Sequence, residues 1–324
     1  MISHKSAARL AALAVFSLGV SNAAAQAWPA KTVRYIVPMG PGSGADTIGR
    51  IVTGGLTQTL GQQFILDNRG GAAGNIGADA GAKAPPDGYT LFQVSSTHAI
   101  NVSVYKSLPY DLMRDLAPVT HLASSPSAVV VHPSLPVKTI AELVKLAKAR
   151  PGQMNYGSTG AGSATFLAAE LFKGMAGVNV VHVPYRGGGE ALTGIASGEV
   201  SVYFAPLAPT LPFIRQDRVR ALAVTTAKRL PQLPELPTVA ESGYKGYQAG
   251  NWYGIEVPAK TSRELVTTIR NAAVAAMNEP ATRKRLLDLG YIIVGDQPEE
   301  FAAFMKSEIA TFAKIIRQTG MTAE

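Results

Sequence analysis

A glycine-rich turn between a predicted strand and a predicted helix is the strongest candidate for a ligand site in this sequence. The apolar run 33–37 ends at Pro38, and closely spaced glycines follow within residues 40–44. A helix that begins there has amide N–H groups with no bulky side chain before them, and its positive dipole end attracts anions. We therefore expect an anion at this turn, either the pyrophosphate of a dinucleotide or a small carboxylate.

The turn satisfies the dinucleotide-binding fingerprint. Gly40, Gly42 and Ala45 have its spacing, and Asp67 lies at the end of the next predicted strand, where an acidic residue would bind the ribose. An exported protein is not expected to meet a nicotinamide cofactor, and no side chain is placed by a motif for hydride transfer. A dinucleotide-binding oxidoreductase that uses the turn from Gly40 to Ala45 is kept as an alternative.

Other catalytic and metal chemistry has little support. The chain has no cysteine, which excludes disulfides and thiolate chemistry. Its five histidines lack metal-ligand spacing, and neither a Gly-Lys-Ser/Thr phosphate loop nor a Gly-x-Ser-x-Gly nucleophile elbow occurs. We predict that the protein is not an enzyme and uses no metal or cofactor. An exported enzyme acting on acidic substrates is the second alternative.

Residues 1–27 are predicted to be a secretory signal peptide. Lys5 and Arg9 supply positive charge, residues 10–20 form an apolar run, and small residues at 23–27 offer cleavage sites. The apolar run is shorter than the roughly 20 residues that span a bilayer. We therefore expect an exported, periplasmic protein without a membrane anchor.

Composition and charge indicate a folded protein that binds small anions. Of the 324 residues, 47% are hydrophobic, which suggests two domains of ordinary size. The net charge of +8 falls to +6 without the signal, because the signal holds two basic residues and no acidic one. No basic block with interleaved aromatics occurs, so we expect a diffuse positive field and no nucleic-acid partner.

Strands and helices alternate along the chain, which predicts an α/β fold. The first unit has predicted strands at 33–37, 63–66 and 89–94, with helices at 46–60 and 76–83. A stretch of low helical propensity runs through 101–111. The second unit has predicted strands at 129–131, 179–183, 200–204 and 220–225, and helices at 139–149, 164–175 and 190–197.

Two predicted helices at the C-terminal end, 261–277 and 298–319, need a sheet to cover, so the chain should return to the first unit. We place the crossings near 118–120 and 247–253. Lobe 1 is predicted to comprise residues 28–122 plus 250–324, and lobe 2 residues 123–249. Each lobe is expected to be a mostly parallel sheet flanked by helices.

The carboxyl ends of the predicted parallel strands bring several loops to one edge, where ligands of open α/β sheets bind. These loops offer backbone N–H groups, hydroxyls and few charges, a lining that suits a carboxylate. Strand ends make ligand-binding candidates of Met39, Ser96, Thr97, Tyr185, Arg186 and Ala205, besides the glycine turn at 40–46 and a second glycine-serine turn at 155–163.

Several single residues have two possible roles each. Asp46 either binds backbone N–H groups at a helix start or accepts from a ligand amine or hydroxyl. Arg186 either binds a ligand carboxylate bidentately or is a solvated rim residue. Trp252 and Tyr253 either pack at the return crossing or stack on a ligand. His98 lies at the ligand edge or is an ordinary polar loop residue.

The order of motifs along nearly the whole mature chain resembles the Bug family, the periplasmic solute-binding receptors of tripartite tricarboxylate transporters. The motifs are Ile36-Val37-Pro38, Pro41-Gly42-Ser43-Gly44-Ala45-Asp46, Asp67-Asn68-Arg69, Gly74-Asn75-Ile76-Gly77, Asp87-Gly88-Tyr89-Thr90-Leu91, Leu108-Pro109-Tyr110-Asp111, Tyr156-Gly157-Ser158, Val183-Pro184-Tyr185-Arg186-Gly187 and Pro237-Thr238-Val239-Ala240-Glu241. The resemblance implies a two-lobe Venus-flytrap fold that binds a small carboxylate (a di- or tricarboxylate, an aromatic acid or an amino acid). It also implies delivery to a membrane permease, and we expect a monomer.

The resemblance further implies that main-chain N–H groups of two loops hold the carboxylate. Carried over to this sequence, the ligand-binding residues are Gly42, Ser43, Gly44, Asp46, Ser158, Gly160 and Ser163. Two departures lie beside the expected pocket. Phe166 stands where many members have histidine, and Gly189 with Glu190 replaces a less charged turn. Both bear on which acid is bound.

Overall fold

The computed structural model describes residues 28–319 of the chain. The predicted signal peptide, 1–27, lies outside the described residues. Within the described range, no helix combines the length and the apolar character needed to cross a membrane.

Eight strands form a continuous path of hydrogen-bonded neighbours in the described part of the chain, and two further strands pair with one member of that path. The strands on one side of this path form what we call the first sheet. They are β1 (Val33–Val37), β2 (Phe64–Asn68), β3 (Thr90–Ser95), β9 (Gly250–Pro258) and β10 (Ile292–Ile293). The second sheet contains β5 (Asn155–Ser158), β6 (Val181–Pro184), β7 (Val202–Pro206) and β8 (Arg220–Val224). The long strand β4 (Leu116–Val131) pairs in both.

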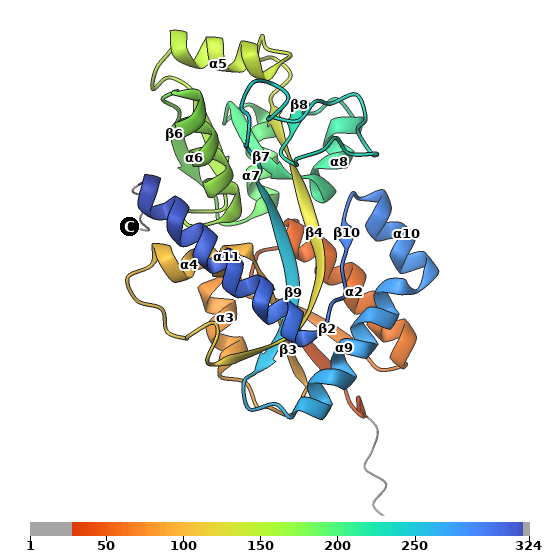
Figure 1. Cartoon of the computed structure of the whole chain (residues 1–324). Helices are drawn as coiled ribbons and strands as arrows, with labels where there is room; N and C mark the ends of the chain where they lie inside the picture. Colours follow the sequence, from red (N-terminus) through yellow and green to blue (C-terminus); the bar gives the residue numbers. More distant parts are fainter. Residues whose placement is uncertain (1–27, 320–324) are drawn as a thin grey trace, which may run out of the picture. The chain divides into compact units, whose positions relative to one another are not determined.

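The predicted parallel units are present in both sheets. β1 pairs in parallel with β2 and β3, and β5 pairs in parallel with β6 and β7. β9 and β4 lie side by side and antiparallel, and β4 continues from the first sheet into the second (Figure 1). β9 also pairs antiparallel with β3, and β4 pairs antiparallel with β7, so each sheet contains both parallel and antiparallel pairs. The α/β class is confirmed.

Helices follow the strands of both sheets. Those of the N-terminal region are α2 (Gly44–Leu60), the short 3-10 helix η1 (Ala72–Gly74), α3 (Asn75–Ala82) and α4 (Ser96–Val104). Next come α5 (Ile140–Ala149), α6 (Ala164–Ala176), α7 (Gly188–Ser197) and α8 (Leu207–Arg215). The C-terminal helices are α9 (Arg263–Asn278), α10 (Pro280–Asp288) and α11 (Pro298–Thr319). α2 packs against α9 and α10, whereas α11 packs on α4 and β4.

Three local predictions were wrong or incomplete. The start of the supposed low-helix stretch, Asn101 to Val104, belongs to α4, because most of its side chains are buried and a capping box of Ser95 and His98 starts the helix. The crossing placed at 118–120 and the strand placed at 129–131 are parts of the single strand β4. Helices α8 and α10 were not predicted, since α8 carries an internal proline and α10 has a polar sequence.

The two predicted boundaries between the lobes fall within one long strand and at the start of another. The limit between 122 and 123 lies inside β4, and the limit between 249 and 250 lies at the start of β9. β4 and β9 pair from Leu116 with Pro258 to Pro126 with Gly250. The assignment of 28–122 plus 250–324 to one lobe and 123–249 to the other stays a prediction.

Candidate functional site

The glycine turn forms the capped start of α2. The Ser43 hydroxyl accepts from the Asp46 N–H at 3.1 Å, and an Asp46 carboxylate oxygen accepts from the Gly42 N–H at 3.0 Å. Asp46 also accepts from Asn68 and from Arg50, so its oxygens are occupied by the protein. Asp46 therefore acts as a helix-start residue that binds a backbone N–H group.

Two helix N–H groups remain for a ligand at this end of α2. Ser43 and Asp46 satisfy the amides around the turn, but the N–H groups of Gly44 and Ala45 have no acceptor in the described part of the chain. The first amides of an α-helix have no partner within the helix, and its dipole favours negative charge there. The turn therefore presents two donors to an anion.

A second capped helix start faces the same region. The Ser163 hydroxyl caps α6 by accepting from Phe166 N–H, and the Ala164 N–H donates to the hydroxyl of Thr97 at 3.3 Å. Thr97 belongs to α4, which follows the first sheet, so this bond joins elements of the two sheets. The predicted glycine-serine turn and the predicted Thr97 thus lie together.

A third loop closes over the glycine turn by direct backbone contact. A side chain at Gly188 would place its Cβ 2.9 Å from Ser43 Cα, and one at Gly42 would place its Cβ 3.2 Å from Gly189 Cα. Gly42 has a φ of +76°, which other residues adopt only with strain. Only glycines permit this approach, and it brings the start of α7 against the start of α2.

Between these helix starts lies a partly open cavity of about 30 Å³, which we call the clamp cavity. Its lining residues are Met39, Ser43, Gly44, Ala45, Ser95, Thr97, Thr159, Ala164, Thr165, Gly188, Tyr203, Pro206, Asn251 and Tyr253. No lining residue is charged, and hydroxyl and amide groups are frequent. Such a lining can donate several hydrogen bonds to an anion.

The tyrosines beside Gly44 are neutral donors. Tyr253 accepts from the side-chain amide of Asn251 at 3.1 Å, and the Tyr291 hydroxyl donates to the Gly44 carbonyl at 3.1 Å. Burial raises the pKa of both Tyr253 and Tyr291 above the ordinary value of a phenol. Both therefore keep their protons at neutral pH.

Next to the clamp cavity is an open cleft of about 760 Å³, which we call the outer cleft. Met39 and Thr159 line both. The other residues of the outer cleft are Gly70, Gly71, Ala72, Ala73, Gly74, Tyr105, Gly160, Ala161, Phe166, His182, Pro184, Tyr185 and Arg186. Arg186 is the only lysine, arginine or carboxylate among them. The volume of the cleft is in the range of small-molecule binding sites.

Phe166 and His182 form an aromatic corner of the outer cleft. Their ring centroids are 4.8 Å apart, and His182 Nε2 lies 2.6 Å from the Ser158 hydroxyl. Burial lowers the pKa of His182 below its ordinary value, so this ring is neutral at pH 7. The departure at Phe166 therefore places an apolar ring in the wall of the outer cleft.

One wall of the outer cleft has an unusual backbone. The φ angle is positive at four successive residues, 71–74, and two of them are alanines, Ala72 at +47° and Ala73 at +50°. Left-handed backbone costs roughly 1–2 kcal/mol for residues with a side chain. The Asn101 side-chain amide holds the loop by donating to the Ala73 carbonyl at 3.0 Å.

Replacing Ala73 by glycine should relieve this strain. We expect Ala73→Gly to raise the free energy of unfolding by about 0.5–1 kcal/mol, less than the full strain because glycine also gains freedom in the unfolded chain. Urea denaturation measures the change. The control is Ala80→Gly within α3, which should lower stability by about 1 kcal/mol. Equal losses in both variants would contradict the presence of strain at Ala73.

The predicted binding residues fall into three groups. Met39, Ser43, Gly44 and Thr97 line the clamp cavity. Gly160, Tyr185 and Arg186 line the outer cleft with Met39, although the Tyr185 ring packs towards Gly157 and Gly194. The remainder support the loops or the sheet through their own hydrogen bonds: Gly42, Asp46, Ser96, Ser158, Ser163 and Ala205.

Residues that were not predicted complete the clamp cavity, among them Tyr203, Pro206 and Asn251. Tyr203 lies two residues before the predicted Ala205 on β7, and strand alternation puts both on one face. That spacing was the available signal. Tyr253 lines the cavity, whereas Trp252 packs against Phe301 and donates to Glu308.

His98 is a structural residue and not a loop residue. It is fully buried in α4, where its Nδ1 accepts from the Ser95 N–H at 3.0 Å. Burial lowers its pKa to about 4, so the ring is neutral. Within residues 28–319 no group of three histidine, aspartate or glutamate side chains could hold a metal ion.

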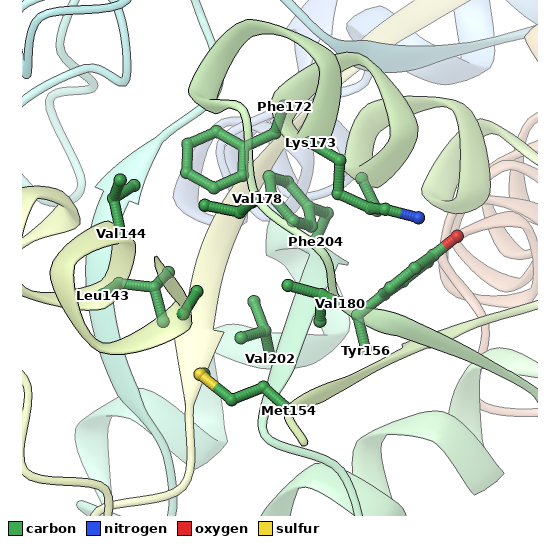
Figure 2. Close-up of a pocket in the computed structure, with 12 residues that line it drawn as sticks. Leu143, Val144, Met154, Tyr156, Phe172, Lys173, Val178, Val180, Val202 and Phe204 are labelled. Atoms are coloured by element: carbon green, nitrogen blue, oxygen red, sulfur yellow. The ribbon is translucent and has the colours of Figure 1, made fainter. Parts of the chain in front are cut away.

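A separate cavity of about 20 Å³ lies in the hydrophobic core beside the second sheet (Figure 2). Figure 2 shows aliphatic and aromatic side chains around it, among them Leu143, Phe172 and Phe204. The polar atoms of Lys173 and Tyr156 both interact with Glu170. This cavity is a packing void of the core and offers no group that would recognise an anion.

The sequence pattern of the tripartite tricarboxylate transporter family receptor, TctC, matches residues 48–321. The chain belongs to this family. Its members are periplasmic solute-binding receptors. The match begins within α2, after β1, and covers the remaining strands and helices described above.

Individual relatives agree with the family assignment. The chain is 32% identical over 316 residues to the protein BugT of Bordetella pertussis, covering 96% of this chain and 97% of BugT. An R. palustris protein solved with adipate has a TM-score of 0.88 and 36% identity, covering 91% of this chain and 99% of that one. MatC from Rhodopseudomonas palustris, with bound malate, has a TM-score of 0.85 and 28% identity, covering 89% and 100%. The fold is therefore the two-lobe fold of periplasmic binding proteins.

Proposed function

We propose that this TctC-family receptor binds a small carboxylate in the periplasm and delivers it to the membrane permease of a tripartite tricarboxylate transporter. The receptor acts as a monomer without catalytic activity, metal or cofactor. The acid group lies in the clamp cavity and the rest of the ligand lies in the outer cleft. Two relatives of similar fold were solved with adipate and malate, which supports an acid as ligand.

The clamp cavity is the observation that carries this proposal. The free N–H groups of Gly44 and Ala45 point to an acceptor, and no carboxylate side chain lines the cavity. A carboxylate accepts several such bonds, and these charge-assisted bonds are stronger than neutral ones. A water molecule in the cavity would bring donors of its own, whereas the lining already has donors and needs an acceptor.

Trapping between loops supplies the mechanism of binding. The starts of α2, α6 and α7 come from different parts of the chain and lie around the cavity. Those of α2 and α7 meet by backbone contact at Gly42, Gly188 and Gly189, and that of α6 bonds to Thr97. An acid that binds donors of several loops stabilises their approach, so ligand binding favours the closed arrangement. A permease can then distinguish the closed receptor from the open one.

The dinucleotide alternative fits these contacts poorly. The backbone of Gly188 and Gly189 occupies the space before the turn from Gly40 to Ala45, where a pyrophosphate would lie. Asp67, the expected ribose partner, is bound by Arg34 at 2.7 Å and by Arg69 at 2.9 Å. Although partial burial raises the pKa of Asp67, these arginine bonds lower it overall. An exported enzyme is disfavoured because no metal set lines either pocket, and Ser158, which lies 2.6 Å from His182 Nε2, is fully buried and lines neither pocket.

A thermal-shift screen tests the proposal. The purified receptor is heated with adipate, malate and benzoate, and with the corresponding amides as neutral controls. A bound acid at about 100 times its Kd should stabilise the fold by about 2.7 kcal/mol and raise the Tm by several degrees. The amides should give no shift. Equal shifts with acids and amides, or none with any acid, would contradict carboxylate binding.

A further inference from the structure

Tyr203 is a buried tyrosine whose hydroxyl has no hydrogen-bond partner in the described part of the chain. It lies on β7, its side chain has an exposed fraction of 0%, and it lines the clamp cavity. A buried polar group without a partner is costly, and native structures rarely leave one unexplained. The position of this hydroxyl therefore calls for an explanation.

The neighbours of Tyr203 in the cavity wall are hydrogen-bond donors. Gly44 and Ala45 bring free N–H groups, and the Tyr253 hydroxyl already accepts from Asn251, which leaves its own proton to donate. Burial, and then the nearby Tyr253, raise the pKa of Tyr203, so it too is a neutral phenol with a proton to donate.

We infer that the Tyr203 hydroxyl donates a hydrogen bond to the acid group of the ligand inside the clamp cavity. This inference rests on the proposed function and extends it from loop amides to a side chain of the second sheet. The guest that satisfies this set of donors is one that only accepts, and a carboxylate is such a group. Tyr203 is thus a recognition residue that selects for an anionic, flat head group.

The position on β7 gives this contact a further consequence. Gly44 and Ala45 belong to α2, which follows the first sheet, whereas Tyr203 belongs to the second sheet. One carboxylate that accepts from both therefore joins the two sheets across the cavity. The hydroxyl contributes to affinity and to closure by the same bond.

The test removes the hydroxyl alone. Tyr203→Phe is compared with the wild type by titration calorimetry against adipate, malate and benzoate. We expect roughly a 10- to 150-fold loss of affinity for the acids that the wild type binds, the range for a hydrogen bond to a charged group. The Tm without ligand should not fall, because the hydroxyl has no partner in the protein.

Tyr35→Phe is the matched control. Tyr35 lies on β1, its exposed fraction is also 0%, and its hydroxyl also has no partner in the described chain, but it does not line the clamp cavity. This variant should bind the acids as the wild type does. Unchanged affinity in Tyr203→Phe, or equal losses in both variants, would overturn the role of Tyr203 but not the proposed function. A wild type that binds none of the acids would contradict the proposed function, and the inference would fall with it.

Discussion

A valine in place of Gly44 is expected to abolish carboxylate binding while the protein stays folded. A Cβ at this position would lie 2.5 Å from the Tyr253 hydroxyl and 3.0 Å from Pro206 Cβ. It would enter the clamp cavity and press against β7, which opposes closure. Because overpacking costs about 1–3 kcal/mol and the new side chain keeps the ligand away from the amide donors, we expect at least a 100-fold loss of affinity.

Gly54→Ala is the control for this variant. Gly54 lies in the same helix, α2, and a side chain there would meet nothing within 4 Å. Alanine should raise stability by about 1 kcal/mol through helix propensity and leave affinity unchanged. Calorimetric titration gives the affinities, and circular dichroism shows whether Gly44→Val folds. A folded Gly44→Val protein with wild-type affinity would place the acid elsewhere.

Glu256→Gln should stabilise the protein at neutral pH. Glu256 on β9 has an exposed fraction of 0%, and neither carboxyl oxygen has a hydrogen-bond partner in the described chain. Burial raises its pKa well above the ordinary 4.5, so the fold keeps this group neutral. Glutamine needs no proton to be neutral, and we therefore expect the free energy of unfolding at pH 7 to increase.

The pH dependence of that gain has a definite sign. Above pH 4.5 the unfolded chain releases the Glu256 proton and the folded chain retains it, so this group makes wild-type stability fall as pH rises. The slope is about 1.4 kcal/mol per pH unit up to the folded pKa. Urea denaturation between pH 4 and 8 should show the gain growing with pH in Glu256→Gln but not in Glu235→Gln, an exposed control. A gain that is independent of pH would contradict a neutral Glu256.

Local sequence signals predicted the helix starts that build the site. Ser43 and Ser163 were placed at turns before helices, and both cap those helices in the structure. The signal is strong because a cap needs only residues a few positions apart. The parallel units of both sheets followed from the same alternation of strands, turns and helices.

Contacts between segments that are far apart in the sequence could not be predicted from local signals. The packing of Gly188 on Ser43 depends on how two loops from different sheets approach, which no local pattern encodes. Helix α4 was missed because burial overrides the low helical propensity of Asn101 to Val104. Tyr203 was missed because its role depends on what lies across the cavity.

A crystal structure with bound acid tests the central claim most directly. The wild type is crystallised with the acid that gives the largest thermal shift in the screen. We predict that a carboxylate oxygen lies within about 3 Å of the N–H groups of Gly44 and Ala45, with the rest of the ligand in the outer cleft. An acid bound outside the clamp cavity, with Gly44 and Ala45 facing only solvent, would contradict the account.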